Sequence, residues 1–167
     1  MPIVNRVAQS KLVTLDIDDL LPRCTVVTLD LMQFMDEGIL REKAFRAHVK
    51  TFDWTQYQKK WVNVWCSEDA IIPLWAYMIV GAQLSLCAIG TVSTLPENAS
   101  TAVILKQIEH LDFTAYAGKP IVLKGCNRPD VGPEAYLVLA EKLSQVAGSL
   151  MFGEACSTVP VFKPAKK

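Results

Sequence analysis

The sequence has no excess of charge of either sign. Its 17 basic residues (Lys and Arg) balance 17 acidic residues (Asp and Glu) over 167 positions, so the formal net charge is zero. A neutral chain lacks the basic surface that nucleic-acid binding requires, and it has no polybasic tract to attract an anionic membrane. We therefore expect neither nucleic acid nor a membrane among the partners.

Signals for secretion and for a disulfide scaffold are also missing. The first residues, 1–6, contain no long apolar run of the kind found in a signal peptide. The five cysteines are odd in number, and the chain is not small. We therefore expect free thiols and a cytoplasmic location. Hydrophobic residues make up 51% of the chain, which is enough for a sizeable core.

Charged residues are absent from one long stretch, residues 70–96, which spans 27 positions. That length is enough to cross a bilayer. Pro73 and several Gln, Ser and Thr residues interrupt the stretch, however, and two glycines suit a helix that is followed by a turn and a strand. We therefore expect a buried helix that leads into a buried strand, and not a membrane span.

Motifs that would identify a reaction are absent as well. The chain has no Gly-x-Ser-x-Gly nucleophile motif, no phosphate-binding loop and no Gly-x-Gly-x-x-Gly fingerprint. No two cysteines have the Cys-x-x-Cys spacing typical of zinc sites. The sequence therefore restricts the fold and indicates a candidate site, but it leaves open whether the protein is an enzyme.

What the sequence does contain is an internal repeat with a period near sixty residues. A motif of Asp, an aromatic residue, Thr, any residue and Tyr occurs at 53–57 and again 59 positions later, at 112–116. A β-rich run ending at or next to a cysteine follows each motif, at 60–66 and at 119–126. Because the period exceeds that of the usual solenoid units, we interpret the repeat as a duplicated half-domain.

Each copy has the element order of a βαβ unit. A proline, Pro73 or Pro133, stands at the start of the expected helix, where its missing N–H costs nothing. The copies extend over approximately 41–93 and 100–156. Two such half-units with an N-terminal strand extension predict a single α/β domain, residues 1–167, with a mostly parallel sheet. The expected strands are 12–17, 24–31, 60–66, 88–92, 119–125 and 149–153, and the expected helices are 41–51, 74–86, 100–111 and 134–147.

Three cysteines occupy similar positions in this pattern. Cys66 and Cys126 stand at the ends of their strands, and Cys156 follows the last expected strand. Open parallel sheets bind ligands outside the carboxyl ends of their strands, so we expect the three thiols to lie along one edge. Helix N-termini at that edge favour the thiolate form.

Three thiolates, with a carboxylate or a water as the fourth ligand, suit zinc or an iron–sulfur cluster. Ser157 and Arg128 are supporting polar residues, and the loop that ends at Arg128 is either an anion site or a plain βα turn. The alternative is that the cysteines are small buried hydrophobic residues, which is how free cysteine usually behaves. The carboxylates nearest in sequence to the three thiols are Glu68, Asp69, Asp130 and Glu154.

A nucleophilic cysteine paired with a histidine base is a further alternative. Only His48 and His110 are available, and both lie in helix-like segments and not at a strand end. We therefore expect both histidines to be solvated or packed.

The two repeated helices differ in charge. The first, residues 74–86, has none, whereas the second contains Glu134, Glu141 and Lys142. An uncharged helix leaves a very apolar surface in the first copy, and such a surface is typical of an interface. The alternative function is therefore a non-catalytic interaction module that forms a homodimer through the first repeat.

Five motifs of the chain are also found in a bacterial family. They are Asn5-Arg6-Val7-Ala8-x-Ser10, Asp53-Trp54-x-x-Tyr57, Cys66-Ser67-x-Asp69-Ala70-Ile71-Ile72-Pro73-x-Trp75-Ala76-Tyr77, Lys124-Gly125-Cys126 and Gly153-Glu154-x-Cys156-Ser157-Thr158-Val159-Pro160. Over essentially its whole length the chain resembles the uncharacterised domain-of-unknown-function family numbered 2480. The resemblance implies a bacterial cytoplasmic protein without an assigned activity. It also implies an association with iron–sulfur cluster assembly proteins as partners, which points to the same three cysteines.

Overall fold

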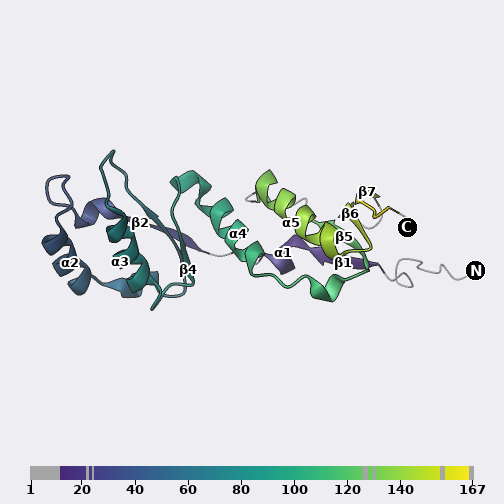
Figure 1. Ribbon diagram of the computed structural model, residues 1–167, viewed down its shortest axis with the longest axis horizontal. Helices are drawn as coiled ribbons and strands as arrows, with labels where there is room; N and C mark the ends of the chain where they lie inside the picture. Colours follow the sequence, from purple (N-terminus) through teal and green to yellow (C-terminus); the bar gives the residue numbers. More distant parts are fainter. Residues whose placement is uncertain are drawn as a thin grey trace, which may run out of the picture. The chain divides into compact units, whose positions relative to one another are not determined.

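The chain forms two compact units in the computed structural model, which describes residues 12–21, 23, 25–125, 128–129, 131–154 and 157–165. Unit 2 is the continuous segment Cys24–Val103, and unit 1 combines Met1–Arg23 with Ile104–Lys167. Each unit contains helices and a sheet of mostly parallel strands (Figure 1). The expected α/β class is therefore confirmed.

The strands form two sheets, where the sequence led us to expect one. In unit 2 the order is β2-β3-β4 and all pairs are parallel. In unit 1 the order is β1-β5-β6-β7, and only β7 runs antiparallel to its neighbour. The strands are β1 (Val13–Asp16), β2 (Val26–Asp30), β3 (Trp61–Trp65), β4 (Gly90–Val92), β5 (Pro120–Lys124), β6 (Ser149–Glu154) and β7 (Ser157–Phe162).

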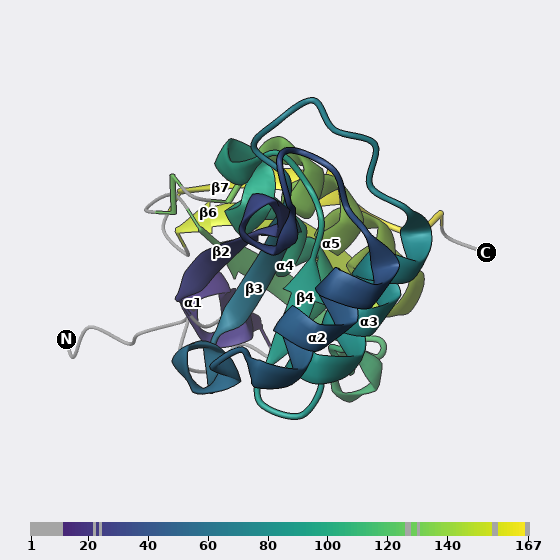
Figure 2. The ribbon, with the colours of Figure 1, turned by 90° about the vertical axis from the view of Figure 1, so that its left-hand side faces the viewer.

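Unit 2 has two helices on one face of its sheet. The connections from β2 to β3 and from β3 to β4 advance across the sheet in the same direction. Because such crossovers are right-handed, α2 (Glu42–Thr51) and α3 (Leu74–Leu84) lie on the same face of the sheet (Figure 2). The rings of Phe45 in α2 and Trp75 in α3 are in edge contact, 5.4 Å between centroids. No helix among the described residues is long and apolar enough to cross a membrane.

Unit 1 repeats this arrangement with different segments. Its short α1 (Ile17–Leu20) follows β1. The helical side of the core comes from α5 (Pro133–Val146) and from the part of α4 (Ala99–Glu109) that begins at Ile104. Ile108 and Leu139 are fully buried in one cluster with Ile121 of β5. Short 3-10 turns complete the two units: Leu31–Phe34, Trp54–Tyr57, Pro96–Asn98 and Thr114–Tyr116.

The repeat is larger than the sequence indicated, because β1 and β2 also correspond. Residues 13–17 read Val-Thr-Leu-Asp-Ile, and residues 27–31 read Val-Thr-Leu-Asp-Leu. β1 pairs with β5 just as β2 pairs with β3, and the aspartates stand opposite Lys124 and Trp65 in the two registers. The offset is 14 for this element and about 59 for the others, because unit 2 is inserted into unit 1 between Arg23 and Ile104.

Strand β7 was not expected. Pro160 in its centre argues against a strand, because proline cannot donate to a ladder and occurs in sheets mainly on edge strands. β7 is an edge strand of this kind, paired only with β6. Unit 2 has no described counterpart of it, so β7 is the main departure from the repeat.

One buried polar residue fixes the chain that follows the sheet of unit 2. Asn63 in β3 has no exposed surface. Its side-chain Nδ2 donates to the carbonyl oxygen of Thr94 at 3.0 Å, and its Oδ1 accepts from the Thr94 backbone N–H at 3.1 Å. The amide therefore pairs with both backbone groups of one residue, 31 positions along the chain.

Replacing Asn63 by Ala is expected to lower the free energy of unfolding of unit 2 by about 1–3 kcal/mol, because the Thr94 backbone groups lose their partners. All four tryptophans of the chain lie in unit 2, so tryptophan fluorescence during urea unfolding reports this unit. Thr94→Ala keeps the backbone groups that bind Asn63 and is the matched control. Equal loss in the two variants would contradict the assigned role.

Candidate functional site

Charged side chains gather where the parallel strands of unit 1 end. Asp16, Lys124 and Glu154 are the last residues of β1, β5 and β6. Because these strands are parallel neighbours, their carboxyl ends meet at one edge of the sheet. The Nζ atom of Lys124 lies 3.1 Å from Oε2 of Glu154, so an ion pair joins the ends of β5 and β6.

A second ion pair lies beside the first, and its arginine is buried. Arg128 is 4% exposed, and its Nη1 donates to Oδ1 of Asp18 at 2.8 Å and to the carbonyl oxygen of Leu21 at 2.9 Å. Asp16 accepts a hydrogen bond from the Asp18 backbone N–H and thereby caps α1. The Arg128 guanidinium thus binds the carboxylate of Asp18 in α1 and the carbonyl oxygen of Leu21, the residue that follows this helix.

These residues surround a small polar cavity of about 70 Å³. Pockets for organic ligands usually measure about 300–1,000 Å³, so this one has room for an ion, a few waters or one small polar group. It is lined by Asp16, Ile17, Asp18, Lys124, Gly125, Arg128 and Glu154.

Tyr136 connects α5 to this edge. Its hydroxyl donates to the carbonyl oxygen of Gly125 at 2.7 Å, and its ring is in edge contact with Phe152. A Cβ atom at position 125 would stand 2.8 Å from the tyrosine hydroxyl oxygen, so only glycine permits this close approach without a shift. The hydrogen bond therefore fixes the point at which the chain leaves β5.

The corresponding edge of unit 2 has different chemistry. Oδ1 of Asp30, the equivalent of Asp16, accepts from the backbone N–H groups of Met32 at 3.0 Å and Ser67 at 3.2 Å. Burial alone would raise the pKa of Asp30, but hydrogen bonds from the Ser67 side chain and from these two N–H groups lower it below 3.8. Partial burial, with repulsion from neighbouring Cys66, raises the pKa of Tyr77.

The expected site residues are only partly covered by the structure. Cys66 follows β3 as expected and is buried, and it belongs to unit 2. Cys126 and Cys156 lie outside the described residues, so a common edge for the three thiols stays a prediction. Asp69 lies exposed in the loop after β3, and Ser157 pairs with Glu154 at the start of β7.

Two further alternatives concerned a metal and a histidine base. Within the described ranges, no group of three or more His, Cys, Asp or Glu side chains is placed to hold a metal ion. The ring of His48 packs against Phe34, with centroids 4.9 Å apart, and against Phe52. His48 is thus packed as expected.

Sequence reasoning missed the two ion pairs that line the polar cavity of unit 1. Arg128 and Asp18 are 110 positions apart, and Lys124 and Glu154 come from different strands. The sequence does contain one signal, the motif Thr-Leu-Asp at 14–16 and again at 28–30. This motif would have placed Asp16 at a strand end beside Lys124 and Glu154.

Comparison with known proteins gives one match. The model of a family described as a protein of unknown function, DUF2480, matches residues 1–164. A search of curated proteins and a search of solved structures gave no match.

Asp30 provides a prediction on pH dependence. Because its pKa is lowered in the folded state, its contribution is complete above pH 3.8 and is lost as the pH falls through the folded-state value. Asp30→Ala is expected to reduce the unfolding free energy of unit 2 by about 1–2 kcal/mol at neutral pH. The difference from the unmodified chain should shrink in acid.

Urea unfolding followed by tryptophan fluorescence at several pH values measures this effect. Asp30→Asn keeps an acceptor oxygen for the cap and is the matched control, expected to retain part of the stability without the acid dependence. A difference between Asp30→Ala and the unmodified chain that stayed constant down to pH 2.5 would show that the ionised carboxylate is not the stabilising group.

Proposed function

The chain belongs to the DUF2480 family of unknown function, and on that premise we propose from its geometry that unit 1 is a thiol site. In this proposal Cys126 and Cys156 act together at the carboxyl edge of the sheet, either as ligands of zinc or an iron–sulfur cluster or as reacting thiols. The protein would then be an accessory in iron–sulfur or thiol chemistry, with iron–sulfur assembly proteins as partners.

One observation carries this proposal. β5 and β6 are parallel neighbours, and the ion pair between Lys124 and Glu154 joins their carboxyl ends. Cys126 follows the end of β5 by two positions, and Cys156 follows the end of β6 by two positions. Parallel sheets bind ligands outside the carboxyl ends of their strands, so in this proposal the two thiols act at that edge.

The polar cavity adds support, because it supplies charged groups beside these segments. Glu154 is the carboxylate nearest to Cys156 in sequence and would be a further ligand of a metal, beside the two thiolates, after exchanging its bond to Lys124. Cys66 stands at the equivalent strand end of unit 2, so it is the third candidate and is tested separately.

The test is metal analysis with a visible absorption spectrum of protein purified without oxygen. We expect near-stoichiometric zinc or iron, lost in Cys126→Ser and in Cys156→Ser because thiolates are the ligands. Cys87→Ser is the matched control: Cys87 belongs to unit 2, and its Sγ contacts the carbonyl oxygen of Trp54 at 3.5 Å. This variant should keep its metal.

A thiol reaction without metal predicts a different result. Cys126 and Cys156 would then be alkylated at least about tenfold faster than Cys87, because thiolates are the reactive form. Metal-free protein in which Cys126 and Cys156 react no faster than Cys87 would eliminate both forms of the proposal. Repeating the analysis with Cys66→Ser tests the third cysteine of the sequence-based hypothesis.

A second candidate function, self-association, rests on the outer face of α3. Leu74 is 80% exposed and Met78, one turn later, is 74% exposed; Ile71, just before the helix, is 95% exposed. Helical positions four apart lie on one face, so Leu74 and Met78 share the outer face of α3, and Ile71 adds an exposed apolar side chain just before it. We name this surface, Ile71, Leu74 and Met78, the α3 face.

A second copy of this chain is the partner that fits the α3 face. No charged residue occurs between residues 70 and 96, so two copies can bring this surface together without like-charge repulsion. The equivalent surface of α5 carries Glu134 and Glu141 and would repel its own copy. Self-association is therefore assigned to the first repeat alone.

Met78→Glu is expected to convert a dimer into a monomer, because each copy would place a charge in an apolar interface. Sedimentation velocity across a range of concentrations measures this change. Leu137→Glu is the matched control, since Leu137 is the repeat equivalent of Met78 and is 71% exposed. An unmodified chain that stays monomeric at high concentration would exclude the dimer.

A further inference from the structure

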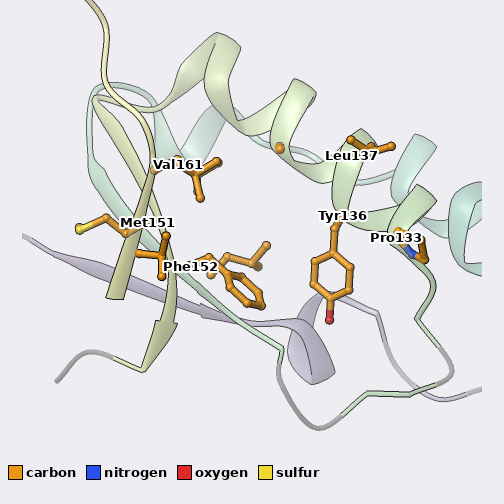
Figure 3. Close-up of a pocket in the computed structure, with 10 residues that line it drawn as sticks. Pro133, Tyr136, Leu137, Met151, Phe152 and Val161 are labelled. Carbon is orange, nitrogen blue, oxygen red and sulfur yellow. The ribbon is translucent and has the colours of Figure 1, made fainter. Parts of the chain in front are cut away.

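A larger cavity, of about 570 Å³, opens in unit 1 between α5 and the hairpin formed by β6 and β7 (Figure 3). Leu137 and Ala140 line it from α5, Phe152 from β6, and Val159 and Val161 from β7. Its volume is in the range of pockets that hold small organic molecules. It is separate from the charged residues at the strand ends, apart from the tyrosine that adjoins both.

The wall of this cavity is hydrocarbon. Among its ten lining residues only Tyr136 has a hydroxyl, amide or charged group in its side chain. That hydroxyl points away from α5, toward the end of β5, and donates to the carbonyl oxygen of Gly125 (Figure 3). A polar group of a ligand would lose its hydrogen bonds to water here without replacing them, which costs about 1–3 kcal/mol or more.

Strand β7 forms one wall of this cavity and contributes little to the core. Val159 is 63% exposed and Val161 is 50% exposed, and both line the cavity. Residues two apart on a strand share a face, so the two valines stand side by side on the cavity wall. The described part of unit 2 has no counterpart of β7. The packing of the core therefore does not explain why β7 carries these two valines.

We propose that this cavity binds the hydrocarbon part of a small amphipathic molecule, such as the chain of a fatty acid, with the polar end of that molecule in solvent. The cavity differs from the α3 face in shape. The α3 face is the convex surface of a single helix and suits another protein, whereas α5 and β7 form two facing walls. The absence of polar wall atoms selects hydrocarbon over sugars, nucleotides and amino acids.

A peptide that adds a strand to β7 is the main competing occupant. Pro160 stands between the two valines and has no N–H to donate, so this edge is a poor template for an added strand. A small molecule needs no backbone partners. The proposal does not depend on the thiol site, because no cysteine among the described residues lines the cavity.

The test is a titration of the full chain with decanoate below its micelle concentration, observed by NMR of labelled Leu and Val methyl groups. We expect the methyl resonances of Leu137 and Val161 to shift and to saturate. Resonances of Leu74, on the α3 face, should not follow the same curve. Cys126→Ser should bind decanoate with unchanged affinity, which separates this outcome from the fate of the thiol proposal.

Filling the cavity provides the decisive variant. Ala140→Phe places a ring in the space between α5 and β7 and is expected to weaken decanoate binding at least about tenfold. Gln145→Phe adds the same ring at an exposed position of the same helix and should bind normally. Circular dichroism and urea unfolding of both variants establish that they fold.

Two results would overturn the proposal. One is the absence of saturable shifts at Leu137 and Val161 up to the solubility limit of decanoate. The other is unchanged binding by a folded Ala140→Phe, which would place decanoate elsewhere. If Ala140→Phe fails to fold, Val161→Thr, at a half-exposed position of the wall, replaces it with the same expectation of weaker binding.

Discussion

Unit 1 depends on the parallel pairing of β1 with β5. In the sequence, the whole of unit 2 lies between these two strands. Asp16 and Pro120 are separated by 103 residues, whereas Asp30 and Trp61, the corresponding ends in unit 2, are separated by 30. Closing the longer connection as an open chain costs about 1 kcal/mol more. The β2–β3 pairing of unit 2 is therefore the less costly of the two to close.

The elements that could be predicted from the sequence are those that repeat at a constant spacing. The β-rich runs became β3 and β5, and the segments after Pro73 and Pro133 became α3 and α5. The correspondence of β1 and β2 was missed because the inserted unit changes the offset for this one element. β7 was missed because Pro160 disfavours a strand, and an edge strand is where proline is tolerated.

The candidate site could be located from the sequence only as far as strand ends. The position of Cys66 after β3 follows from the pattern, because a β-rich run has a recognisable end. The bond from Arg128 to Asp18 does not, since it joins residues 110 positions apart and depends on how a loop meets a short helix. Contacts of this kind are set by tertiary packing, and a single sequence contains no local signal for them.

The two units show how one scaffold acquires different surfaces. In unit 2 the outer face of α3 carries exposed apolar side chains and no charge, and the aspartate at the strand end accepts internal hydrogen bonds. In unit 1 the same helix position keeps acidic residues, the strand end collects two ion pairs, and β7 adds a second apolar wall. These differences lie on surfaces outside the two cores. Those surfaces are therefore where binding to a second copy, a hydrocarbon chain or a metal is expected.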